Sequence, residues 1–131
     1  MSMAFHPGSV SGIPTDAKEV RRMTDAVVRQ AGRRPSTTVY DAVLLAHELY
    51  HLLLITTDGG GAMTVALQAD ATTLDVTVHL DCTHDAPDLD DVTAAGAAVC
   101  WAIILRLTDA VTVTRLPTGA QRLRAQMTLQ G

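Results

Sequence analysis

The sequence predicts an α/β two-layer sandwich, with helices on one face of a mixed, mostly antiparallel sheet. Some segments carry apolar residues at helical spacing or are apolar almost throughout, and others alternate apolar with polar residues, as half-buried strands do. Because each predicted strand has one apolar and one polar face, we expect helices on one side of the sheet and water on the other. The predicted order is helix, helix, strand, strand, helix, strand, strand.

A chain of 131 residues has room for one domain with one hydrophobic core. Residues 1–14 contain Gly, Ser and Pro without a regular pattern, so we expect a flexible N-terminal arm there and a single domain over residues 15–131. Hydrophobic residues make up 47% of the chain and aromatic residues only 3%, so the core is expected to be aliphatic.

The predicted domain begins with two helices. Asp16 is the expected N-cap of the first helix, which carries an apolar stripe and runs to about Gln30. Ser36 and Thr37 are candidate N-caps of the second helix, which runs to about Ile55. Because this second helix is apolar over most of its surface, we expect it to lie in a central, largely buried position.

Strands and a third helix complete the domain. Apolar residues alternate with polar or small ones over 63–67 and again over 74–80, which predicts two strands. A third helix is expected from about residue 88 to residue 107. A final hairpin is expected to have its arms at 111–113 and 123–129, joined by a turn that contains Pro and Gly.

Charge and composition exclude several classes of function. The net charge of −4 argues against nucleic-acid binding, which needs a concentrated basic patch. The sequence carries no signal-peptide pattern, and no uncharged apolar run reaches the roughly 20 residues of a membrane span. Two cysteines, Cys82 and Cys100, fit a reduced protein of the cytoplasm.

The segment His47-Glu48-Leu49-Tyr50-His51 matches the motif H-E-x-x-H. On a helix, histidines at positions i and i+4 share a face and can hold a zinc ion, and the glutamate between them can act as general base. One interpretation of the sequence is therefore a small zinc-dependent hydrolase that uses His47, Glu48 and His51. The alternative is that these histidines simply occupy a polar strip on the helix.

A catalytic zinc ion needs a third protein ligand. The downstream histidine of the extended motif is absent from this sequence. The remaining downstream candidates are His79, Asp81, His84 and Asp85, of which the first two share one face of a predicted strand.

Several strings, in this order and spacing, resemble the histidine-kinase-like ATPase domain, and most closely its bacterial anti-sigma-factor serine kinase branch. The resemblance covers about residues 16–130. It rests on the Leu-Leu-Ala-His-Glu-Leu string at 44–49, the strand at 76–81, the Gly-Ala-Ala-Val string at 96–99 and the hairpin over 109–129. The resemblance implies that Glu48 is a catalytic base, that Asp81 contacts the adenine of a nucleotide and that Gly96 belongs to a phosphate-binding loop.

The chain departs from this family at sites that build the Mg-ATP complex. The family has a magnesium-binding asparagine where Leu52 stands, and leucine offers no oxygen ligand. The family has two glycines directly after its aspartate, where this chain has the bulkier residues 82–85. Ala98 replaces the second glycine of the phosphate loop, so the access of glycine to positive φ is lost there.

These departures predict a non-catalytic regulatory protein that has a degenerate histidine-kinase-like ATPase fold and acts by protein–protein binding. The resemblance implies a sigma factor or an anti-sigma antagonist as the partner, or a second copy of the chain in a homodimer. The zinc-dependent hydrolase and an active ATP-dependent serine kinase are the alternatives. No bound cofactor is expected in the first case, zinc in the second and Mg-ATP in the third.

Overall fold

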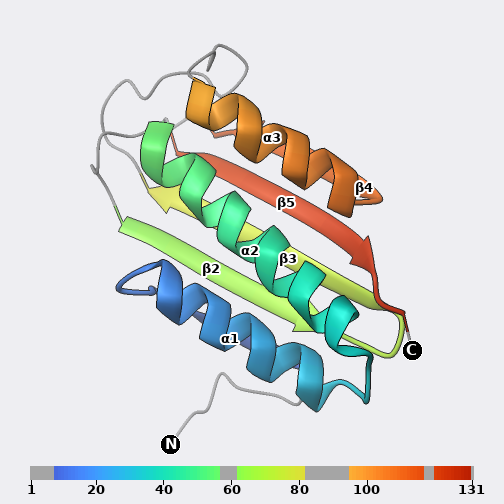
Figure 1. Cartoon of the computed structure of the whole chain (residues 1–131). Coiled ribbons are helices and arrows are strands. Elements are labelled where there is room, and N and C mark those ends of the chain that lie inside the picture. The colour runs from blue at the N-terminus through green and yellow to red at the C-terminus, as the bar shows by residue number, and fades with distance from the viewer. Residues whose placement is uncertain (1–7, 57–61, 82–94, 117–119, 131) are drawn as a thin grey trace, which may run out of the picture.

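The computed structural model describes residues 8–56, 62–81, 95–116 and 120–130 (Figure 1). Within these residues the chain forms one sheet and one layer of helices. The elements in order are β1 (Ser9–Gly12), α1 (Ala17–Gln30), α2 (Ser36–Thr56), β2 (Ala62–Ala69), β3 (Thr73–Asp81), α3 (Ala95–Leu107), β4 (Ala110–Arg115) and β5 (Gln121–Thr128).

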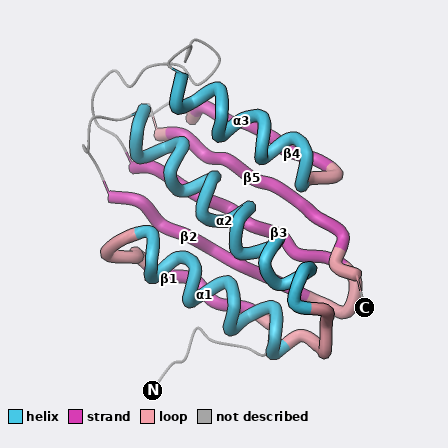
Figure 2. The backbone as a smooth tube through the Cα atoms, viewed as in Figure 1, coloured by secondary structure: helices cyan, strands magenta, loops and turns pink. Residues whose placement is uncertain are grey.

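The strands form one open sheet in the order β1-β2-β3-β5-β4. Each neighbouring pair of these strands is antiparallel, so the prediction of a mixed sheet is wrong in that respect. The helices lie together on one face of the sheet (Figure 2). The prediction of an α/β fold in which helices cover one face is confirmed.

Alternation along β3 shows how the sequence assigns the two faces. Leu74, Val76 and Val78 are fully buried, whereas Asp75 and Thr77 between them are partly exposed. Side chains of a strand alternate between faces, so the apolar set packs under the helices and the polar set faces away from them. The same pattern recurs in β2 and β5.

β1 lies in the segment where we predicted a flexible arm, so that prediction is wrong over residues 9–12. This short strand pairs with β2 from Ser9 opposite Gln68 to Gly12 opposite Val65. Its sequence, Ser-Val-Ser-Gly, has little strand propensity, and only the ladder with β2 makes it a strand. The rest of the predicted arm, residues 1–7, lies outside the described residues.

The first helix begins and ends where the sequence predicts. The Asp16 carboxylate accepts the backbone N–H of Glu19 at 2.9 Å, which is the expected N-cap bond, and α1 ends at Gln30. For α2 the predicted caps, Ser36 and Thr37, lie one and two residues too late. The carbonyl of Pro35 accepts the N–H groups of Thr38 and Val39, so Ser36 is already helical.

Arg34, just before α2, binds the turn between β2 and β3. Its guanidinium donates to the carbonyl oxygens of Asp70 at 2.6 Å and Ala71 at 3.0 Å, in the turn between β2 and β3. That turn is closed by the Asp70 carboxylate, whose pKa is held below its ordinary value by the backbone N–H groups of Thr72 and Thr73.

α2 occupies the centre of the helical layer, between α1 and α3 (Figure 1). Leu45, Leu49 and Leu53 are fully buried, as the apolar surface of this helix predicts. The stretch Ser36–Ile55 is long and apolar enough to cross a membrane, yet 56% of it is buried inside the fold, and a core helix passes the same test. The third helix is described from Ala95, and residues 88–94 of the prediction lie outside the described residues.

Candidate functional site

A cluster of polar side chains lies in the contact between α2 and α3. Glu48 and His51 come from α2 and Cys100 comes from α3, and their carboxylate, imidazole and thiol atoms all lie within 4.8 Å of one another. Cys100 Sγ is 3.6 Å from His51 Nδ1. The cluster is shielded from water, since Glu48 is 9% exposed and Cys100 2% exposed.

Helical spacing explains why these residues meet. Glu48 and His51 are three residues apart in α2, so they share one face of that helix. Cys100 lies between Ala97 and Ile104 on the buried face of α3, at spacings of three and four residues. Packing of this face against α2 brings the thiol to the Glu48 and His51 side chains.

The environment of Cys100 suppresses its reactivity as a thiolate. Burial raises the pKa of the Cys100 thiol to about 12, and the hydrogen bond to Glu48 and the negative charge of that carboxylate add to the effect. Because the thiolate is the nucleophilic form of cysteine, Cys100 is a protonated, weakly reactive thiol at neutral pH.

His47 flanks this cluster. Its Nδ1 lies 3.6 Å from Oε1 of Glu48, and its ring centroid is 5.9 Å from that of His51. The residues of the H-E-x-x-H motif are therefore neighbours on α2, as their spacing predicts. Sequence reasoning missed Cys100 as their companion, because the motif records only contacts along one helix and the cysteine fitted a small apolar residue.

The downstream metal ligands that the sequence suggested do not join this cluster. His79 and Asp81 share the alternation of Asp75 and Thr77, which places them on the face of the sheet that points away from α2. The other two candidates, His84 and Asp85, lie outside the described residues.

The residues that the family resemblance assigns to a nucleotide come from three different elements. Glu48 lies in the contact between α2 and α3, Asp81 is exposed at the end of β3, and Gly96 lies in the first turn of α3. Leu52, at the position of the magnesium-binding asparagine, is fully buried in the core. A side chain at position 52 thus points into apolar surroundings.

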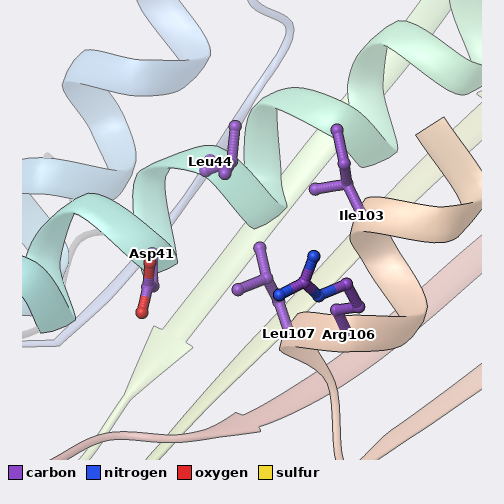
Figure 3. Close-up of a pocket in the computed structure, with 5 residues that line it drawn as sticks. All are labelled: Asp41, Leu44, Ile103, Arg106 and Leu107. Atoms are coloured by element: carbon purple, nitrogen blue, oxygen red, sulfur yellow. The ribbon is translucent and has the colours of Figure 1, made fainter. Parts of the chain in front are cut away.

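A groove of about 380 Å³ lies further along the same two helices (Figure 3). Leu44 of α2 and Ile103 and Leu107 of α3 give it apolar walls. Asp41 stands on the α2 side and Arg106 on the α3 side, so the groove carries opposite charges on its two walls.

The outer face of α3 is apolar and exposed. Val99 is 59% exposed and Leu105 60% exposed. At 100° per residue these side chains fall on one arc of the helix, together with Ala98, Ala102 and Arg106, which are also exposed. We call these five residues the α3 outer face; Arg106 is its single charge.

Comparison with models of known protein families finds no match for this chain. Comparison with curated proteins likewise finds no significant match.

Proposed function

We propose that this chain is a non-catalytic regulatory protein, with a degenerate histidine-kinase-like ATPase fold, that acts by binding another protein. The observation that carries the proposal is the α3 outer face. By analogy with the family that the sequence resembles, the partner is a sigma factor or an anti-sigma antagonist.

The α3 outer face has the chemistry of a protein–protein contact. A helix that is apolar on all sides is normally buried, and contiguous exposed apolar surface marks interaction sites. Scattered exposed apolar residues need no such explanation, but Val99 and Leu105 share one arc with only alanines and an arginine. The neighbouring groove, with Asp41 and Arg106 on opposite walls, offers charges that can fix the register of a partner.

The proposal that the chain is not a catalyst is supported by the residue at the magnesium position. Phosphoryl transfer depends on positioning and on magnesium, which needs oxygen ligands in near-octahedral geometry. Leu52 supplies no oxygen and is enclosed by the core, and Asp81 belongs to the opposite face of the sheet from Glu48. The lack of an oxygen ligand at position 52 supports the proposal that magnesium-dependent phosphoryl transfer is lost.

Site-specific photo-crosslinking in the cells that make the protein tests partner binding. A photoreactive amino acid replaces Leu105 in one variant and Ile13 in the control. Ile13 is 64% exposed, so the two positions match in exposure and differ in their surroundings. We expect a discrete adduct from position 105 only, with a sigma factor or an antagonist identified by mass spectrometry. No adduct, or equal adducts at both positions, would contradict the proposal.

A thermal-shift measurement with ATP tests whether the chain binds a magnesium-nucleotide complex, which a kinase requires. A ligand that binds the native state raises the melting temperature by mass action. We expect no change with ATP, either with Mg²⁺ or with EDTA. A rise that requires Mg²⁺ would favour the active serine kinase instead.

A further inference from the structure

We propose that Glu48, His51 and Cys100 form a zinc site that fastens α3 to α2. This inference goes beyond the proposed function and does not depend on it. The donors are a carboxylate, an imidazole and a thiol, which as thiolate is a strong zinc ligand. They come from two helices that are far apart in the sequence, so a shared metal ion would cross-link the two helices.

The geometry of the cluster suits a tetrahedral ion. Zn–S bonds of about 2.3 Å and Zn–N bonds of about 2.0–2.1 Å place the sulfur and nitrogen about 3.6 Å apart in a tetrahedron. Cys100 Sγ and His51 Nδ1 are 3.6 Å apart. The Glu48 carboxylate lies at most 4.8 Å from the other donor atoms, so its oxygen needs to move by only about 1 Å to complete the set.

Charge balance also favours a divalent ion in this buried place. When zinc binds, the Zn–S bond replaces the S–H bond of Cys100 and the proton leaves to solvent. The thiolate and the Glu48 carboxylate then neutralise the two positive charges, while His51 contributes a neutral nitrogen. A neutral assembly is what a site shielded from water tolerates best. Three protein ligands leave the fourth position to a water molecule, on the side where His51 is partly exposed.

This ligand set differs from the one that H-E-x-x-H predicts. In the hydrolase interpretation His47 is a ligand and Glu48 is the free base. Here Glu48 belongs to the ligand set, and His47 contacts its carboxylate with Nδ1 at 3.6 Å. His47 is thus a positioning residue beside a ligand, a role whose loss typically weakens metal binding about 10- to 100-fold.

Metal titration of the full chain, first stripped with EDTA, tests the site. We expect one Zn²⁺ per chain, and with Co²⁺ as probe an absorption band from charge transfer between thiolate and metal. Cys100→Ser should abolish that band, and both Cys100→Ser and His51→Ala should weaken zinc binding by more than about 100-fold, whereas His47→Ala weakens it less. Cys82→Ser is the matched control and should keep both the band and the affinity.

Several outcomes would overturn the proposal. These are no stoichiometric zinc in the wild-type chain, a cobalt band that survives Cys100→Ser but not Cys82→Ser, or His47→Ala abolishing binding that Cys100→Ser leaves intact. The last result would instead support the H-E-x-x-H ligand set. If Cys100→Ser does not fold, the band in the Cys82→Ser variant still decides, because Cys100 is then the one remaining thiol.

Discussion

α2 and α3 are alike in apolar character and differ in their surroundings. Both are apolar around most of their circumference, which is typical of buried helices. α2 has a helix on either side and the sheet below it, whereas α3 lies at the edge of the layer (Figure 1). The difference teaches that an apolar helix needs other elements to cover it, and that among the described residues α3 is covered on one side only.

The reactivity of Cys100 reports on how closely α3 packs against α2. Cys100 is the point at which α3 brings a polar atom to α2, and burial there raises the pKa of the thiol from 9.0 to about 12. The fraction of thiolate below pH 9 is therefore lowered by about a thousandfold relative to an ordinary cysteine. We predict that Cys100 in the Cys82→Ser variant, kept in EDTA, is alkylated at least about thirtyfold more slowly than in urea, because the higher nucleophilicity of a high-pKa thiolate offsets only part of its lower abundance.

The raised pKa of Cys100 also predicts how the free energy of unfolding changes with pH. Between pH 9 and 12 the folded protein holds a proton that the unfolded chain has lost, so the free energy of unfolding should fall as the pH rises through that window. The alkylation rate of the folded protein should keep rising through the same window. A rate that levels off near pH 9 would show that the contact between the helices is open to water.

Truncation of a leucine in α2 should have the largest effect on stability. Leu49 is fully buried in the hydrophobic core. Leu49→Ala removes buried methyl groups and leaves a cavity, so we expect a loss of about 2–5 kcal/mol in the free energy of unfolding, measured by urea denaturation. A loss below about 1 kcal/mol would mean that the centre of the layer is loosely packed.

The anchor of α2 to the sheet should contribute less. Arg34→Ala removes the charged donors to the carbonyls of Asp70 and Ala71, and we expect a loss of about 1–2 kcal/mol. The neighbouring Arg33 is exposed, and Arg33→Ala serves as the control with an expected change within about 0.5 kcal/mol. Equal losses in the two variants would indicate a general charge effect rather than an anchor.

Elements with a strong local pattern were predictable from the sequence. The N-cap bond of Asp16, the strands with alternating leucine and valine, and the buried course of α2 follow from propensity and periodicity. β1 was not predictable from its own sequence, because it is a strand only through its hydrogen bonds with β2. The Pro35 cap was also missed, because its backbone carbonyl rather than a side chain accepts the first bonds.

The candidate site divides in the same way. The grouping of His47, Glu48 and His51 follows from helical spacing alone. The approach of Cys100 depends on how α3 packs on α2, and a sequence pattern does not record that long-range contact. The exposure of Val99 and Leu105 was missed for the related reason that apolar residues in a helix are normally expected to face a core.

The smallest effect should come from the same truncation on α3. Leu105 is 60% exposed, so Leu105→Ala removes little buried area, and alanine is the better helix former. We expect a change within about 0.5 kcal/mol in urea denaturation, against the several kcal/mol of Leu49→Ala. The measurement should be repeated at a tenfold higher protein concentration, because a homodimer held by the α3 outer face would make stability concentration-dependent. A loss of more than about 2 kcal/mol at both concentrations would show that Leu105 is covered within the single chain. That result would show that α3, like α2, is buried within the single chain, and it would contradict the argument that a partner protein binds the α3 outer face.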